Sequence, residues 1–209
     1  MKRILAFGDS NTWGYDPATG QRYDETIRWT GLLQKALGEQ ALILEEGLCG
    51  RTTVFEDTDR VGRNGLAALP SVLRRSEPLD AAIIMLGTND CKTIFNANPH
   101  IIGKGLELCL DELEKYIAPE KILVISPIKL GSDVYLPEKD PEFDKTSIDT
   151  SRELKREYEK IAKRRGNQFL AASDYADPSA VDDEHMDEKG HEKLSEAIIN
   201  KLEEMKIAG

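Results

Sequence analysis

The sequence predicts a three-layer α/β/α sandwich built on a five-stranded parallel sheet. Two observations indicate this fold: short apolar runs recur along the 209 residues, and segments with helical periodicity separate them. Strands joined in this way form right-handed crossovers, which place helices on both faces of a parallel sheet. The runs expected to be strands are residues 3–7, 41–44, 81–86, 121–126 and 168–171.

The segments between these runs have the apolar spacing of amphipathic helices. One helix is expected to bury Ile102, Leu106, Leu110, Leu113 and Ile117, and the last to bury Leu194, Ala197, Ile198, Leu202 and Met205. Between these two segments, Thr150 and Glu153 have the spacing of a capping box, and Gly166 supplies a C-terminal stop. We therefore expect a helix that begins at Thr150 and ends at Gly166. Residues 130–148 predict a surface loop over one end of the sheet.

Composition restricts the class of protein. Residues 1–209 are expected to form one domain, with 40% hydrophobic residues. The 38 acidic and 28 basic residues leave a net charge of -10, which disfavours nucleic acid or an anionic membrane as a partner. Three cysteines cannot form a disulfide framework, and no run approaches a secretory or membrane-spanning segment. We therefore expect a cytoplasmic protein, and homo-oligomerisation stays open.

Polar residues that could carry chemistry follow four of the predicted elements. Because ligands bind outside the carboxyl ends of parallel strands, the loops to inspect are residues 8–12, 47–51, 87–90 and 182–185. They hold a serine, a glycine, an asparagine and an Asp/His pair, respectively. Acyl transfer needs this set: a nucleophilic hydroxyl, a base, a carboxylate that orients the base, and donors for an oxyanion.

Four segments resemble the motif blocks of the SGNH (GDSL) hydrolase superfamily, whose fold is flavodoxin-like, and three of them are closer still to its bacterial arylesterase/acyltransferase branch. The first three are Gly8-Asp9-Ser10-Asn11-Thr12-Trp13-Gly14, Glu46-Gly47-Leu48-Cys49-Gly50-Arg51-Thr52-Thr53 and Ile84-Met85-Leu86-Gly87-Thr88-Asn89-Asp90, and the fourth is Asp182-Asp183-Glu184-His185. The resemblance implies that Ser10 is the nucleophile and that His185 is the base, with Asp182 as its partner. It also implies that the Ser10 and Gly50 N–H groups and the Asn89 side chain form the oxyanion hole.

Two positions depart from the superfamily's pattern. Asn11 follows the serine where the eponymous motif has leucine, and Glu184 precedes the histidine where the superfamily more often has an apolar residue. Asp183 stands beside Asp182, but the two-residue gap to His185 favours Asp182 as its partner.

Each of these residues also has a purely structural interpretation. Ser10 could be a helix N-cap, Gly50 a turn residue with positive φ, and Asn89 a loop-capping side chain. Asp182, Asp183, Glu184, His185 and Asp187 together could bind a metal, which we consider less consistent with the sequence because no second cluster of ligands accompanies them.

The remaining candidates are aromatic, histidine and cysteine side chains near the predicted edge. Trp13, Tyr15 and Phe95 could line a substrate pocket or belong to the core. His100 and His191 are expected to have surface, capping or packing roles, which leaves His185 as the base. We expect Cys49 and Cys91 to be small buried residues that fill space.

The sequence therefore predicts a serine esterase that hydrolyses small carboxylic esters, or transfers their acyl group to an alcohol, without cofactor or metal. A carbohydrate O-acetyl esterase is the nearest alternative. A non-catalytic flavodoxin-like module that binds a phosphorylated ligand is a third, disfavoured because the first loop lacks Arg and Lys. The expected partner is a small-molecule ester, and neither nucleic acid nor a membrane is expected to bind.

Overall fold

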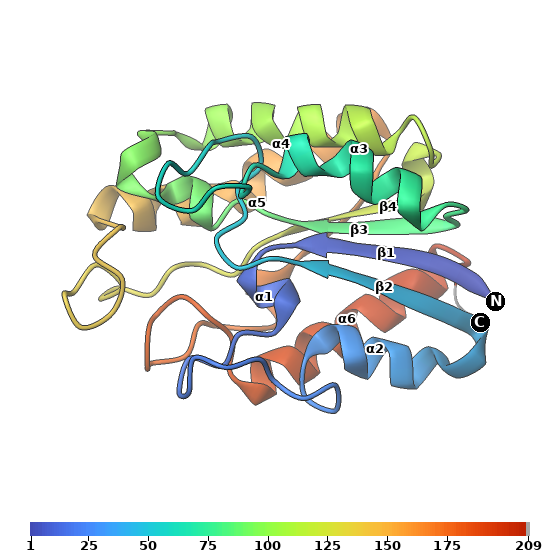
Figure 1. Cartoon of the computed structure of the whole chain (residues 1–209), viewed down its shortest axis with the longest axis horizontal. Helices are drawn as coiled ribbons and strands as arrows, with labels where there is room; N and C mark the ends of the chain where they lie inside the picture. The colour runs from blue at the N-terminus through green and yellow to red at the C-terminus, as the bar shows by residue number, and fades with distance from the viewer. Residues whose placement is uncertain (208–209) are drawn as a thin grey trace.

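The computed structural model describes residues 1–207 and confirms the predicted α/β fold (Figure 1). Its five-stranded sheet has the order β2-β1-β3-β4-β5, and each neighbouring pair is parallel. The strands are β1 (Lys2–Gly8), β2 (Ala41–Gly47), β3 (Ala81–Met85), β4 (Ile122–Ser126) and β5 (Gln168–Ala171). From β1 the chain continues to β2 on one side of β1 and then to β3 on the other side. The loops after β1 and β3 therefore meet at a topological switch point.

Helices cover both faces of the sheet. They are α1 (Ser10–Trp13), α2 (Trp29–Leu37), α3 (Gly65–Ser76), α4 (Pro99–Leu113), α5 (Lys145–Arg165) and α6 (Glu188–Glu204). Short 3-10 turns are η1 (Gly38–Gln40), η2 (Asn89–Cys91), η3 (Thr93–Phe95), η4 (Pro119–Lys121) and η5 (Ala172–Asp174). Figure 1 shows α3, α4 and α5 on one face and α2 and α6 on the other. Among the described residues, no helix is long and apolar enough to cross a membrane.

Alternation along β1 divides the core into two layers. Leu5 and Phe7 are buried in the layer beneath α3, α4 and α5, whereas Ile4 and Ala6 are buried beneath α2 and α6. Successive side chains of a strand point to opposite faces, so a continuous apolar run is the expected pattern for a strand that is covered on both sides.

Strand β2 is longer than its apolar run predicts. It continues beyond Leu44 to Gly47, and Phe7 and Gly8 of β1 pair with Glu46 and Gly47. The apolar signal ends early because β2 is an edge strand, and its acidic residues reach arginines: Glu45 pairs with Arg28 at 2.8 Å.

The start predicted for the helix before Gly166 is wrong. Helix α5 begins at Lys145, because the Asp144 side chain accepts a hydrogen bond from the Ser147 N–H and the Ser147 hydroxyl bonds back to the Asp144 N–H. Thr150 and Glu153 lie inside this helix. Its predicted end is confirmed, since Gly166 adopts a left-handed conformation with φ of 82°.

Candidate active site

The loop after β1 presents Ser10 at the start of α1. The Asp9 side chain accepts a hydrogen bond from the Asn11 N–H at 3.0 Å, which holds the tight turn. Glycine is required at position 8, because a Cβ there would lie 2.7 Å from the Met85 carbonyl oxygen. Burial raises the pKa of Asp9 to about 7, although its hydrogen bond from Asn11 acts in the opposite direction.

Ser10, His185 and Asp182 form one hydrogen-bonded chain, although 175 residues separate the serine from the histidine. The Ser10 Oγ lies 2.8 Å from His185 Nε2, and His185 Nδ1 lies 2.6 Å from Asp182 Oδ2. The other Asp182 oxygen accepts hydrogen bonds from the backbone N–H groups of Glu184 and His185, both at 3.0 Å. Asp182 therefore holds both the imidazole ring and the loop that carries it.

The charges around His185 favour its protonated form. Burial of the ring lowers the pKa, but the nearby Glu184 and Asp182 carboxylates outweigh it, so the pKa of His185 is raised above its usual value. Burial acts to raise the pKa of Asp182, but the hydrogen bond and charge of His185 prevail and lower it. The ring is thus set up to accept a proton beside a carboxylate that stays ionised.

Gly50 and Asn89 line the same pocket as Ser10. Gly50 has the positive φ of 81° that the sequence suggested, and a glycine has no side chain of its own to cover its N–H. The Asn89 amide donates one hydrogen bond to the Arg51 carbonyl oxygen at 3.2 Å, which ties the loop after β3 to the loop after β2. An amide group has two N–H donors, so this bond leaves one for a ligand.

Two further residues, which the sequence analysis did not identify, hold these loops together. The Arg51 guanidinium donates to the Gly8 carbonyl oxygen at 2.9 Å and lies over the Phe7 ring. The buried Asp90 carboxylate accepts hydrogen bonds from the Thr53 backbone N–H and hydroxyl, and burial raises its pKa to about 6. Both lie in the motif blocks, directly after predicted site residues, but their sequence positions do not indicate these contacts.

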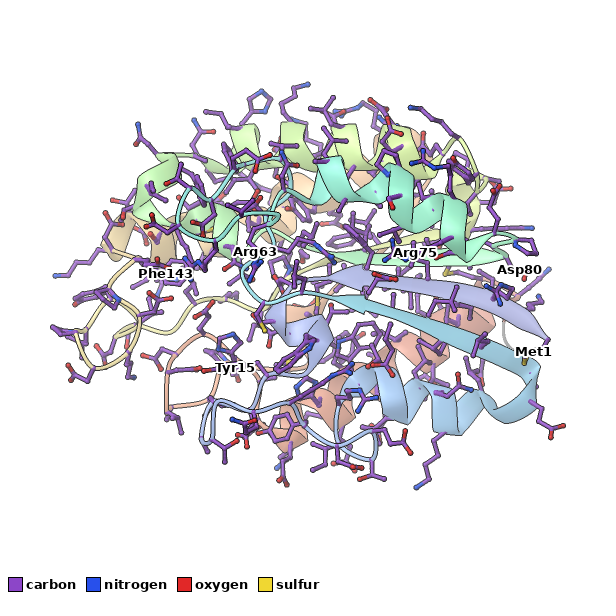
Figure 2. All side chains as sticks on the ribbon, in the orientation of Figure 1. Met1, Tyr15, Arg63, Arg75, Asp80 and Phe143 are labelled. Carbon is purple, nitrogen blue, oxygen red and sulfur yellow. The ribbon has the colours of Figure 1, made fainter. Side chains whose placement is uncertain are left out.

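The pocket has a volume of about 240 Å³ and charged walls. Besides the triad, Gly50 and Asn89, its lining residues are Tyr15, Cys49, Arg60, Lys92, Lys139, Asp140 and Glu184. Lys139 and Asp140 come from the irregular segment before α5, which therefore contributes to the site. Figure 2 shows Tyr15 and, from that segment, Phe143 at the end of the molecule opposite Met1, where the strands have their carboxyl ends.

The predicted aromatic and cysteine residues take different places. The Tyr15 ring centroid lies 4.3 Å from that of His185, and Tyr15 lines the pocket. Trp13 and Phe95 are not among the lining residues: Trp13 packs beneath Arg22, and Phe95 stacks on Phe55 with centroids 4.9 Å apart.

Cys91 is a buried residue, as expected, and its thiol donates to the Gly87 carbonyl oxygen. The same expectation is wrong for Cys49, which is only partly buried and lines the pocket. Burial and the neighbouring Asp9 raise the pKa of the Cys49 thiol to about 11.

The other two histidines lie away from Ser10. His191 is fully buried in α6, where its Nδ1 accepts a hydrogen bond from the Trp29 N–H at 3.3 Å, and burial lowers its pKa to about 4. His100 lies on the surface, 3.1 Å from a Glu157 oxygen.

The acidic residues close to His185 in the sequence contact different partners in the structure. Asp183 forms an ion pair with Lys139 at 2.9 Å, and Asp187 caps α6 by accepting a hydrogen bond from the Gly190 N–H at 2.7 Å. Across residues 1–207, no group of three or more His, Cys, Asp or Glu side chains is arranged to hold a metal ion.

Asn11 connects the loop that carries Ser10 to the loop that carries His185. Its side-chain oxygen accepts a hydrogen bond from the Met186 N–H at 3.0 Å, and its amide nitrogen donates to the Glu184 carbonyl oxygen at 3.4 Å. These partners flank His185 on both sides. Asn11 is 3% exposed, and its own carbonyl oxygen accepts from the indole N–H of the fully buried Trp29 at 3.1 Å. The residue that departs from leucine at this position thus ties the loop that carries Ser10 to the loop that carries His185.

Asn11→Leu should therefore lower both stability and kcat. Leucine cannot replace the two hydrogen bonds, and each buried polar group left without a partner costs about 1–3 kcal/mol. A small displacement of His185 from Ser10 should lower kcat by about 10- to 100-fold. Thermal unfolding and ester-hydrolysis kinetics of the folded variant measure the two effects. An unchanged kcat would show that Asn11 does not align the base.

The fold and the site together define a class: a three-layer α/β hydrolase with a Ser-His-Asp hydrogen-bonded chain at the carboxyl edge of a parallel sheet. The chain belongs to the GDSL-like lipase/acylhydrolase family, whose model matches residues 6–193. This confirms the resemblance drawn from the sequence motifs. No curated protein sequence matches the chain.

Solved structures agree with this assignment. The native aryl esterase from M. smegmatis is 34% identical, with a TM-score of 0.89, and the match covers 98% of this chain and 100% of that one. A carbohydrate acetylesterase, Est24, from Sinorhizobium meliloti is 33% identical over the same shares, with a TM-score of 0.90. The protein is a carboxylic ester hydrolase.

Proposed function

We propose that the protein hydrolyses small acyl esters through a covalent Ser10 acyl-enzyme. The observation that carries this proposal is the chain of hydrogen bonds from Ser10 to His185 and from His185 to Asp182, at 2.8 and 2.6 Å. His185 Nε2 takes the Ser10 proton while Ser10 Oγ attacks the ester carbonyl carbon. The tetrahedral intermediate then expels the alcohol, which receives the proton from His185. Water, or a second alcohol, attacks the acyl-enzyme in the same way and restores Ser10.

The developing oxyanion would be held by three donors. They are the backbone N–H groups of Ser10 and Gly50 and the Asn89 amide hydrogen that does not bond to Arg51. Two of the donors are backbone groups, and the hydrogen bond to Arg51 holds the third in place, so they need little reorganisation as charge develops.

The pocket supports a short acyl group. Its volume of about 240 Å³ leaves little room for a long acyl chain. The aryl esterase and carbohydrate acetylesterase neighbours support aryl and carbohydrate acetates as candidate substrates. None of these steps requires a cofactor or metal. We further propose a cytoplasmic location, which the three free cysteines support.

A fluorophosphonate probe tests the covalent step. We expect mass spectrometry to find the label on Ser10, because only an activated hydroxyl reacts with such a probe. A Ser10 that stays unlabelled in folded protein would instead favour a non-catalytic binding module.

Asn89→Ala should lower kcat by about 10²- to 10³-fold and change KM less, because an oxyanion donor acts on charge that develops in the transition state. Steady-state kinetics on phenyl acetate measure both constants. A rise in KM alone would identify Asn89 as a residue that binds the ground state.

A further inference from the structure

Glu184 is the one charged side chain of the pocket with no hydrogen-bonding partner among the described residues. It is 6% exposed, and one of its oxygens lies 3.9 Å from His185 Nδ1, beyond hydrogen-bonding distance. A buried carboxylate without a donor is costly, and in folded proteins such groups usually have a partner. Burial accordingly raises the pKa of Glu184.

The cations of the pocket do not supply that partner. Lys92 forms ion pairs with Glu142 and with Asp140, the latter at 3.8 Å. Arg60 contacts Asp57 at 2.7 Å and also Glu142. Lys139 is held by Asp183. Each cation is thus engaged by another acid, and the Glu184 oxygens remain acceptors on the pocket wall.

The position of Glu184 also indicates which part of a substrate it would meet. The leaving alcohol must receive its proton from His185, so the alcohol portion of the ester lies on the histidine side of the pocket. Glu184 lines the same pocket as Ser10 and His185. A short acyl group such as acetyl carries no hydroxyl, so a hydroxyl donor that reaches Glu184 must come from the alcohol portion. Lys92 lines the same pocket and its charge still acts on Glu184, which disfavours a positively charged alcohol and favours a neutral donor.

We propose that Glu184 is a specificity-determining residue whose carboxylate accepts a hydrogen bond from a free hydroxyl on the alcohol portion of the ester. The enzyme therefore prefers acetates of polyhydroxylated alcohols, such as sugars, over esters that lack a donor there. This inference rests on the proposed acyl-enzyme function and names its substrate class.

The test compares three acetates: a monoacetylated sugar with free hydroxyls, the same ester with those hydroxyls converted to methyl ethers, and phenyl acetate. Values of kcat/KM are taken on the alkaline plateau of the pH profile, where His185 is neutral and a change in its pKa has no effect. The wild type should prefer the free sugar acetate over its methyl ether by about 10- to 100-fold. A site that hydrogen-bonds a substrate hydroxyl discriminates against an analogue without one, because the buried acceptor is then left without a partner. Glu184→Val should remove this preference, and Glu184→Gln should keep part of it.

Asp177→Asn provides the matched control, since it neutralises an exposed acid in the loop before Asp182. It should keep the wild-type preference. An equal loss on all three esters in Glu184→Val would overturn the proposal, because Glu184 would then act on His185 alone. A preference for the free sugar acetate that survives in Glu184→Val would also overturn it, because that preference would come from the bulk of the methyl groups. A wild type that prefers an amino-alcohol acetate over the sugar acetate would overturn it as well.

Failure of the underlying function looks different. A wild-type protein that neither cleaves phenyl acetate nor reacts with the fluorophosphonate at Ser10 would refute the acyl-enzyme and this inference together. A wild type that cleaves phenyl acetate, but treats the free and methylated sugar acetates alike, would refute only the role of Glu184.

Discussion

Ser10→Ala should remove nearly all ester hydrolysis and leave the fold intact. The substitution deletes the atom that attacks the carbonyl, and loss of a nucleophile that works as a unit with its base costs about 10⁴- to 10⁶-fold in kcat. Structurally, the change deletes a single hydroxyl, whose one side-chain hydrogen bond within residues 1–207 is to His185 Nε2.

Initial rates on phenyl acetate and a thermal melt followed by circular dichroism measure the two properties. The fluorophosphonate should also fail to label the variant. Appreciable turnover by folded Ser10→Ala would show that another group performs the chemistry.

His185→Ala should also lower kcat/KM by about 10⁴- to 10⁶-fold, because it removes the base. In the wild type, kcat/KM should fall as the pH decreases and His185 becomes protonated. The usual histidine pKa is about 6.5. Burial lowers the value for His185, but Glu184 and Asp182 more than compensate, so the acid limb should have its midpoint above that reference.

His191 supplies the contrasting variant. It accepts a hydrogen bond from the Trp29 N–H and lies away from Ser10, so His191→Ala should lower stability and keep the acid limb. His191→Asn, which can retain an acceptor there, serves if the alanine variant fails to fold. The pH profiles of kcat/KM decide the assignment. An inactive, folded His191 variant together with an active His185→Ala would reverse the roles of the two histidines.

The strands and most of the helices could be predicted from the sequence because their signals are local. Residues buried on both faces of a parallel sheet form continuous apolar runs, as in β1, β3 and β4. The errors occur where the local signal is incomplete. Strand β2 extends into Glu45 and Glu46 because its pairing with β1 continues. Helix α5 begins at Lys145 because the side chain of Asp144 caps its first turn.

The residues of the candidate site likewise fall into those that the sequence could locate and those that it could not. Ser10, Asn89, Asp182 and His185 could be located because motif blocks follow predicted elements and lead to one edge of the sheet. Lys92, Arg60 and Lys139 could not, since isolated basic residues in turns and loops look like ordinary surface residues. The importance of Asn11 and Glu184 was equally hidden: the sequence shows both departures from the motif, and only the fold shows their surroundings.

The sequence by itself determined the order of strands and helices, the identity of the chemical groups and the edge at which they gather, because these follow from periodicity and chain connectivity. Tertiary structure alone decided the rest. It brought His185 to within 2.8 Å of Ser10, placed the Asn11 amide between the residues that flank His185, and left Glu184 without a donor on the pocket wall. The physical reason is range: hydrogen bonds and desolvation depend on ångström distances between segments far apart in the chain, and no local pattern encodes them.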